Sequence, residues 1–368
     1  MLVCFRCDAS LEIGSGHVMR CLTLANTLAK EGAECRFVCR QYPGNMIEEI
    51  NRRGFNAVGL PLNDSSQTKF IQESDIPTHS LWLGANWHMD ALQTIESVKG
   101  KKLDWLVVDH YGINYLWEDV LSTHSQNILV IDDLADRKHS CDILLDQNLI
   151  AEKETRYDFL LPEKCKKLLG PEYALLQPAY SELRNKAKAR HGPVRRILIY
   201  FGGADRHNIT GLALEGFLAL GNHEITVDVV MNDASPHSQT VQNLVRNYPN
   251  IILHGNIPSL APLMLEGDLF IGASGATTWE RCCLGLPALV VTLAENQKPI
   301  AKELDRRGLI YWIGDAETIS LIEIKRQLEK TINKDLDIAW SKSCMKLVDG
   351  FGANKVKNEM KAKFQQCA

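Results

Sequence analysis

The sequence lacks long apolar runs and concentrated basic regions. No apolar stretch approaches the roughly 20 residues that a helix needs to span a bilayer, and Arg6 and Asp8 interrupt the first apolar run, so we expect neither a signal peptide nor membrane insertion. The 41 lysines and arginines are scattered among 45 aspartates and glutamates, which argues against nucleic-acid binding. Low-complexity segments and short repeats are also missing. The expectation is a globular protein of the cytoplasm.

The eleven cysteines do not have the pattern of a disulfide framework. Several lie in strand-like apolar runs, and Cys282 and Cys283 are adjacent in an apolar helical segment. The spacing Cys4-x-x-Cys7 suggests a metal knuckle, but a strand directs residues three apart to opposite faces, and no second pair has zinc-finger spacing. We therefore expect buried, reduced thiols.

The order of apolar and helical segments predicts two domains. A chain of 368 residues exceeds one ordinary domain of about 150 residues. Short apolar runs alternate with segments of helical period, and residues 105–108 and 128–131 have the near-continuous apolar pattern of strands in a parallel sheet. A segment framed by Gly-Pro pairs, residues 170–193, separates two such series and holds a helix predicted over 181–190. We predict two Rossmann-like, doubly wound α/β domains facing a cleft, residues 1–175 and 176–368.

A glycine loop follows the first predicted strand. Gly14 and Gly16 allow the backbone to approach a ligand closely, and the helix that begins near His17 presents free N–H groups to an anion. Met19 stands where a dinucleotide fingerprint needs a small residue, which argues against NAD. An imidazole at a helix N-terminus tends to stay neutral, so His17 is a candidate general base. The alternatives are a simple tight turn and a histidine with an ordinary surface role.

A second loop of this kind follows the apolar run 269–271. Ser274, Gly275 and Thr277 precede or begin a helix, where N–H and hydroxyl groups can hold a diphosphate. Glu280 lies one turn further on, and its carboxylate could accept both hydroxyls of a ribose. The alternative is a capped helix in which Thr277 and Glu280 form a capping box.

Further polar loops also follow predicted strands. We expect four of their residues to contribute to ligand binding: Asn148, Gly203, Asn296 and Gln297. The adjacent pair Asp132 and Asp133 could ligate a metal ion, but neighbouring carboxylates at a strand end diverge. The expectation is a site without metal or other cofactor.

Several motifs recur in the order that a known family shows. They are residues 6–10 (RCDAS), 13–22 (IGSGHVMRCL), 131–137 (IDDLADR), 145–148 (LDQN), 170–176 (GPEYALL) and 274–280 (SGATTWE). Together they resemble the UDP-2,4-diacetamido-2,4,6-trideoxy-β-L-altropyranose hydrolases of pseudaminic acid biosynthesis. The likeness extends from residue 3 to about residue 310. The family commonly has alanine where this chain has Cys7.

The resemblance implies a GT-B fold and hydrolysis of a sugar–phosphate bond, with release of UDP and the free diacetamido sugar. It implies that His17 activates water for inverting attack at the anomeric carbon without metal, with Asp8 beside it. Glu280 would hold the ribose, and the Ser274 loop the diphosphate. UDP is a good leaving group when its developing charge is stabilised, so one base suffices and the carboxylate pair of glycosidases is unnecessary.

Two rival interpretations stay open. The first is a GT-B glycosyltransferase that uses the same kind of donor. A UDP-sugar epimerase is a further enzyme of similar architecture. The second is a protein that binds a nucleotide sugar without catalysis. UDP release in water alone separates hydrolysis from transfer, and the effect of His17→Ala separates catalysis from binding.

Overall fold

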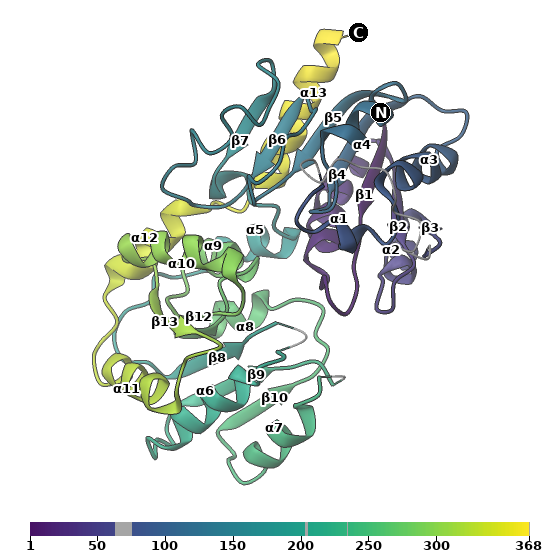
Figure 1. Cartoon of the computed structure of the whole chain (residues 1–368). Helices are drawn as coiled ribbons and strands as arrows, with labels where there is room; N and C mark the ends of the chain where they lie inside the picture. Colours follow the sequence, from purple (N-terminus) through teal and green to yellow (C-terminus); the bar gives the residue numbers. More distant parts are fainter. Residues whose placement is uncertain (63–75, 203–204, 234, 368) are drawn as a thin grey trace. The chain divides into compact units, whose positions relative to one another are not determined.

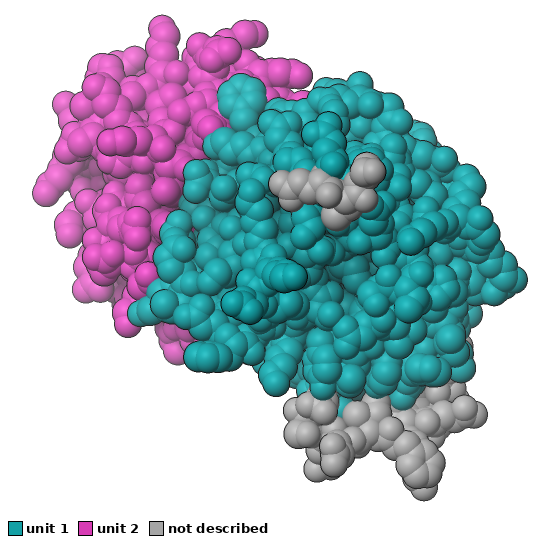
Figure 2. Space-filling model, turned by 90° about the horizontal axis from the view of Figure 1, so that it is seen from above, with its two compact units in different colours: residues 1–148, 152–175, 351–368 teal, residues 149–151, 176–350 magenta. Residues whose placement is uncertain are grey.

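A computed structural model of the chain describes residues 1–62, 76–202, 205–233 and 235–367 (Figure 1). It consists of two compact units (Figure 2). Unit 1 comprises residues 1–148, 152–175 and 351–368, and unit 2 comprises residues 149–151 and 176–350. The prediction of two parallel-sheet α/β domains is confirmed. The C-terminal segment corrects the predicted boundary, because residues 351–368 return to unit 1.

Among its described residues, unit 1 contains a seven-stranded sheet in the order β3-β2-β1-β4-β5-β6-β7. Every neighbouring pair in it is parallel. Parallel strands require crossover connections, and helices or loops supply them here. The strands are β1 (Leu2–Cys7), β2 (Glu34–Arg40), β3 (Asn56–Leu60), β4 (Leu103–Asp109), β5 (Ser125–Ile131), β6 (Ile143–Asp146) and β7 (Lys166–Leu169).

Helices cover both faces of this sheet. Val3 and Phe5 of β1 pack in one apolar cluster with residues of α1 and α13, whereas Cys4 packs in a second cluster with residues of α3 and α4. The two-residue period of a strand produces this alternation. The helices of unit 1 are α1 (Gly16–Ala29), α2 (Ile47–Arg52), α3 (Trp87–Ser97), α4 (Tyr115–Ser122) and α13 (Gly352–Cys367), with short 3-10 turns η3 (Ser80–Leu83) and η4 (Pro171–Tyr173).

Unit 2 repeats the architecture with a six-stranded parallel sheet among its described residues, in the order β10-β9-β8-β11-β12-β13. Its strands are β8 (Arg196–Tyr200), β9 (Thr226–Val230), β10 (Ile251–His254), β11 (Leu269–Gly272), β12 (Ala288–Thr292) and β13 (Tyr311–Asp315). Its helices are α5 (Pro178–Arg184), α6 (Ile209–Leu218), α7 (Ser238–Val245), α8 (Ala261–Glu266), α9 (Thr277–Cys283), α10 (Lys298–Arg306), α11 (Leu321–Ile332) and α12 (Ile338–Leu347), with the 3-10 turn η5 (Glu295–Gln297).

The strand orders place one switch point in each sheet. In unit 1 the order runs outward in opposite directions from β1 and β4, which are hydrogen-bonded neighbours. In unit 2 the corresponding neighbours are β8 and β11. Ligands of doubly wound sheets bind beyond the carboxyl ends of the strands at such points. The loops after these four strands are therefore the places where a site is expected.

Several local predictions need correction. The helix predicted over residues 181–190 spans Pro178–Arg184, and Arg190 lies beyond it and bonds backbone carbonyls of unit 2. Its guanidinium donates to Met264 O (2.7 Å) and Gly267 O (3.1 Å). Residues 63–75, in the polar stretch that follows β3, lie outside the described residues. None of the described helices combines the length and apolarity needed to cross a membrane.

Candidate active site

The loop after β1 is a tight turn stabilised by Ser10. The Ser10 hydroxyl accepts from the backbone N–H of Ile13 (2.9 Å), and its carbonyl accepts from Gly14 N–H (2.9 Å). Gly14 has a φ of +79°, a conformation that glycine adopts without strain. A Cβ at Gly14 or at Gly16 would meet no atom within 4 Å, so there is open space beside these two glycines. The first turn of α1 carries no acidic residue that would repel an anion.

The His17 side chain is fixed by a carboxylate that lies on the neighbouring strand. Its Nδ1 atom is 2.6 Å from Oδ1 of Asp109, the last residue of β4. Arg20 Nη2 lies 3.2 Å from the same nitrogen. Because an ionised carboxylate only accepts hydrogen bonds and the contact with Asp109 is the shorter one, we assign the ring proton to Nδ1, which donates to Asp109. With Nδ1 protonated, the neutral form of the ring has its lone pair on Nε2, and none of the described residues bonds to that atom. His17 is thus held in the tautomer that can accept a proton at Nε2.

Arg20 keeps Asp109 ionised. The guanidinium lies one helical turn after His17 and donates to both carboxylate oxygens, from Nε to Oδ2 and from Nη2 to Oδ1, each at 2.6 Å. Asp109 is fully buried, and burial alone would raise its pKa. The positive charge of Arg20, with help from His17, outweighs burial and holds the pKa of Asp109 below its ordinary range. Asp109 therefore stays a hydrogen-bond acceptor for the imidazole.

Tyr111 and Asp133 complete this cluster. The Tyr111 hydroxyl donates to Asp133 Oδ1 (2.5 Å), and Asp133 Oδ2 accepts from Arg20 Nη1 (3.2 Å). The Tyr111 ring packs edge-on against the His17 ring, with centroids 4.7 Å apart and planes at 84°. Burial, followed by the charge of Asp133, raises the pKa of Tyr111, so its hydroxyl remains a donor. The imidazole is therefore oriented by hydrogen bonding on one side and by packing on another.

Asp8 does not have the position expected from the sequence. The imidazole of His17 pairs with Asp109, whereas Asp8 Oδ1 accepts from Arg6 Nη1 (2.7 Å) and from the backbone N–H of Arg40 (2.6 Å). Its other oxygen lies 3.2 Å from His110 Nε2. Asp8 has no exposed surface and so presents no oxygen to solvent water. The structure gives it a structural role in a buried ion-pair network.

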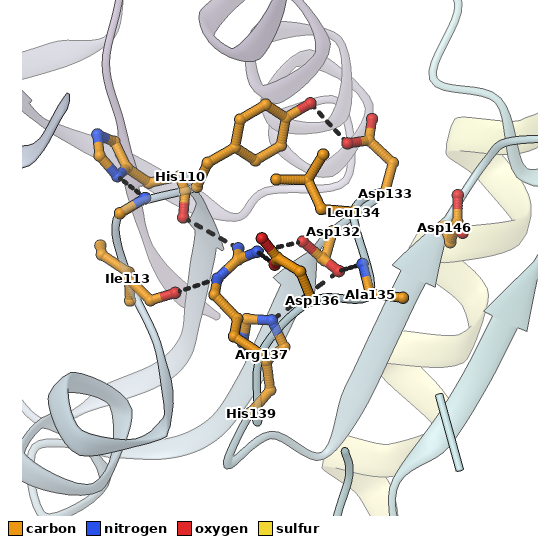
Figure 3. Close-up of polar contacts among 12 residues, drawn as sticks. His110, Ile113, Asp132, Asp133, Leu134, Ala135, Asp136, Arg137, His139 and Asp146 are labelled. Carbon is orange, nitrogen blue, oxygen red and sulfur yellow. Dashed lines mark hydrogen bonds and ion pairs between the residues drawn. The ribbon is translucent and has the colours of Figure 1, made fainter. Parts of the chain in front are cut away.

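Asp132 and Asp133, adjacent at the end of β5, point to different partners. Asp132 accepts from Ala135 N–H (2.9 Å) and pairs with Arg137 Nη1 (2.9 Å). Figure 3 shows the Arg137 guanidinium beside Asp132 and Asp136, where it also binds the carbonyl oxygens of His110 and Ile113. The two carboxylates diverge, as the sequence predicted. The network ties the loops after β4 and β5 together.

Asn148 lies in a polar segment that follows β6. Its backbone N–H donates to Asp146 Oδ1 (2.9 Å), and Asp146 Oδ2 accepts from Arg156 Nη1 (2.8 Å) and the Tyr157 hydroxyl (3.1 Å). Burial raises the pKa of Asp146 to about 7; the Arg156 charge opposes the rise and Asp133 adds to it. Asn148 itself is mostly buried, at 7% exposure.

The loop between β11 and α9 forms the second candidate site, in unit 2. The hydroxyl oxygens of Ser274 and Thr278 are buried and have no hydrogen-bond partner among the described residues. A buried hydroxyl without a hydrogen-bond partner is unfavourable unless a ligand or a water molecule supplies the hydrogen bond. A Cβ at Gly275 would meet no atom within 4 Å. The residue that caps α9 is Ala276, without a side-chain cap, so the alternative of a Thr277–Glu280 capping box is wrong.

Glu280 lies among tyrosines. Burial raises its pKa to about 7, and a hydrogen bond from Tyr180 opposes the rise. Burial and the neighbouring Glu280 charge raise the pKa of Tyr200 to about 12. Tyr200 ends β8, the strand next to β11, so these residues surround the switch point of the second sheet. Glu280 is partly exposed and available to a ligand.

The remaining predicted binding residues have varied positions. Asn296 is exposed on η5, whereas the side-chain oxygen of Gln297 accepts from Leu293 N–H (3.0 Å) and so stabilises the loop after β12. Gly203 lies outside the described residues.

The sequence analysis did not identify three residues of the first site, Asp109, Arg20 and Tyr111. Asp109 and Tyr111 carry the same signal as the predicted ones, since they end or directly follow an apolar run.

Two doubly wound units, each with polar loops at its switch point, define a two-domain α/β fold of the GT-B type. No family model matches the chain. Solved structures with this fold include MurG of Acinetobacter baumannii (TM-score 0.62, 14% identity, 98% of this chain and 99% of that one). Another is UGT89C1 of Arabidopsis thaliana in complex with UDP-L-rhamnose (TM-score 0.65, 12% identity, 98% of each chain).

Sequence comparison links the chain to particular proteins. It is similar to the UDP-2,4-diacetamido-2,4,6-trideoxy-β-L-altropyranose hydrolase of Campylobacter jejuni, with 27% identity over 84% of this chain and 97% of that protein. It is also similar to the spore coat polysaccharide biosynthesis protein SpsG of Bacillus subtilis (24% identity, 95% of this chain, 94% of that protein). A match to an uncharacterised Methanocaldococcus jannaschii protein (25% identity, 79% of this chain) spans only 55% of that relative.

Proposed function

We propose that the chain is a UDP-sugar hydrolase that cleaves UDP-2,4-diacetamido-2,4,6-trideoxy-β-L-altropyranose to UDP and the free sugar, as a step of pseudaminic acid biosynthesis. The observation that carries the proposal is the His17–Asp109 pair, which leaves Nε2 able to accept a proton. The similarity to the Campylobacter jejuni hydrolase supports the choice of reaction and substrate.

His17 is the general base in this proposal. Nε2 takes a proton from a water molecule as the water oxygen forms a bond to the anomeric carbon. The bond between that carbon and the diphosphate oxygen breaks, and its electron pair leaves with UDP. Attack opposite the leaving group inverts the anomeric centre. Positioned proton transfer of this kind contributes about 100- to 10,000-fold to a rate.

Asp109 and Arg20 are positioning residues in this mechanism. Asp109 holds the Nδ1 proton and stabilises the imidazolium that forms when Nε2 accepts its proton. Arg20 holds Asp109 ionised and in place through two hydrogen bonds of 2.6 Å. Asp8 has no role at the water in this proposal, because it is buried and accepts from the Arg6 guanidinium and from the backbone N–H of Arg40.

The residues of unit 2 bind the nucleotide in this proposal. The unpartnered hydroxyl of Ser274, the N–H groups at Gly275 and Thr277, and the start of α9 stabilise negative charge on the diphosphate as the bond breaks. Glu280 accepts the ribose hydroxyls. We also keep the other predicted ligand contacts in this proposal, each within its own unit: Gly14, Gly16 and Asn148 in unit 1, and Asn296 and Gln297 in unit 2. Predicted Gly203 lies outside the described residues. No step requires a metal ion or other cofactor.

The decisive experiment is hydrolysis in water enriched in heavy oxygen, followed by mass spectrometry of both products. Attack at carbon places the label on the sugar, whereas label on UDP contradicts the mechanism. His17→Ala should reduce the rate of hydrolysis by about 100-fold or more, which is the contribution of a general base. Its affinity for UDP should change only a few-fold. An active His17→Ala enzyme would remove His17 from the proposed mechanism.

A glycosyltransferase is the second candidate, because MurG shares the fold over 98% of the chain. It predicts no release of UDP until an acceptor alcohol is added. A binding protein without catalysis predicts UDP binding and no turnover under either condition. The same labelled-water experiment, run with and without acceptor, therefore separates the three functions.

A further inference from the structure

An aromatic cluster adjoins His17 and has no part in the proton transfer described above. It consists of His79, Trp82 and Tyr111. The Trp82 ring stacks on Tyr111 with centroids 5.8 Å apart and planes at 27°, and His79 packs against both rings at 4.8 and 5.6 Å. Tyr111 in turn contacts His17 at 4.7 Å. The cluster therefore extends from the proposed base into a partly exposed aromatic surface.

The backbone beneath this cluster is tightly fixed. The carbonyl of Trp82 accepts from the Tyr42 hydroxyl (2.8 Å) and faces His110 Nε2 (3.2 Å). A Cβ added at Gly112 would come within 2.9 Å of the His79 carbonyl, so the loop after β4 contacts the segment before η3 closely. Tyr111 is also held by its bond to Asp133 (2.5 Å). Rings that are fixed in this way can bind a ligand with little loss of conformational freedom.

We infer that His79 and Trp82, backed by Tyr111, form the subsite for the methyl groups of the sugar and select a sugar that carries methyl groups in place of hydroxyls. This inference rests on the proposed function, because the proposed substrate is a 6-deoxy sugar with two acetamido groups. Aromatic faces remove methyl groups from water favourably, whereas a hydroxyl placed there loses its hydrogen bonds to water. One methyl group in such a site is worth about 10- to 200-fold in discrimination.

The geometry explains why this surface lies where it does. In the proposed mechanism the bond to be cleaved lies near His17 Nε2, so other substituents of the same sugar ring reach the residues around the imidazole. Tyr111 is the ring in direct contact with His17, and Trp82 and His79 continue the surface outward. Aromatic side chains supply large, rigid apolar area for small ligands.

The test measures binding in the His17→Ala background, where the substrate is not consumed. Calorimetry compares the diacetamido UDP-sugar, UDP-N-acetylglucosamine and UDP alone. Compared with His17→Ala, the double variant His17→Ala/Trp82→Ala should bind the diacetamido UDP-sugar at least 10-fold more weakly. It should lose most of the preference for this sugar over UDP-N-acetylglucosamine, and its affinity for UDP should change by no more than about 3-fold. Trp82→Phe should restore most of the preference, because it keeps an aromatic face.

The matched control is Leu81→Ala, which changes a side chain that is 85% exposed on the same 3-10 turn. It should leave all three affinities within 2-fold. Unchanged preference in Trp82→Ala, in a protein that still binds UDP, overturns the inference even if hydrolysis is observed. If the wild-type chain does not hydrolyse the sugar nucleotide but Trp82→Ala abolishes the preference, the subsite stands and the hydrolase assignment fails.

Discussion

Replacing Asp109 by asparagine tests whether this carboxylate sets the tautomer of His17. The substitution keeps the size of the side chain but turns one acceptor oxygen into an NH2 group. Both oxygens of Asp109 accept from Arg20, and Oδ1 also accepts from His17 Nδ1. In either orientation of the asparagine amide, the new NH2 group faces an N–H donor of Arg20. When the NH2 group lies next to the imidazole, it can donate to Nδ1, and the ring proton then moves to Nε2.

The expected loss follows from the role of Nε2. A ring protonated at Nε2 cannot accept a proton there, so the variant loses the contribution of the base, about 100- to 10,000-fold. At about 1.4 kcal/mol per tenfold change, this corresponds to about 2.7–5.5 kcal/mol of transition-state stabilisation. We expect kcat to fall by at least about 100-fold, and by no more than in His17→Ala. Asp109→Asn also leaves the Arg20 charge less compensated, which costs up to about 3–5 kcal/mol of folding stability.

The assay is the initial rate of UDP release between pH 6 and 9, with thermal unfolding and UDP affinity measured on the same preparations. Asp133→Asn is the matched control, because Asp133 contacts Arg20 and Tyr111 but not His17. It should lose far less rate than Asp109→Asn at comparable stability. A folded Asp109→Asn enzyme whose kcat stays within tenfold of wild type would refute the assignment of the tautomer.

Two further predictions concern other parts of the chain. Because burial raises the pKa of Glu280 to about 7, its ionised form decreases as the pH falls below 7. If ribose binds the ionised form, the affinity for uridine should weaken by about tenfold per pH unit below the pKa. Calorimetry of Glu280→Gln should show weaker uridine binding that does not depend on pH. An equal pH dependence in the wild type and the variant would contradict this role of Glu280. Met360 of α13 is fully buried in the core of unit 1, so Met360→Ala should destabilise that unit by about 2–5 kcal/mol, whereas exposed Asn358→Ala should have little effect in denaturant unfolding.

The sequence predicted those parts of the fold that local patterns determine. The strand predicted before the glycine loop is Leu2–Cys7, and the helix predicted to begin near His17 is Gly16–Ala29. The strand β7 (Lys166–Leu169) was missed, because Lys-Lys-Leu-Leu has neither alternation nor a long apolar run. The strand β13 was missed for a similar reason, since Gly314 interrupts its short apolar stretch. Both are edge strands, where one neighbour is missing and the apolar requirement is weaker.

Contacts distant in sequence could not be predicted in the same way. Ala353, Val356 and Met360 of α13 pack in the core of unit 1. The sequence does not show this, because the same apolar face could pack against either unit. The partner of His17 was equally undetermined. Asp8 and Asp109 both follow or end an apolar run, and only the sheet order, in which β4 is the neighbour of β1, brings Asp109 to the imidazole. The residue types of the site were visible, whereas their pairing depended on topology.

The pairing also explains why proton transfer is assigned to His17 rather than to a carboxylate. Asp109 accepts from His17 and Arg20, and Asp133 from Arg20 and Tyr111. Asp8 is enclosed by its arginine partners. Low pKa values make Asp109 and Asp8 poor bases, because a group that is stabilised as an anion gains little by accepting a proton. His17 Nε2 bonds to none of the described residues, and the Asp109 carboxylate orients the imidazole through its contact with Nδ1.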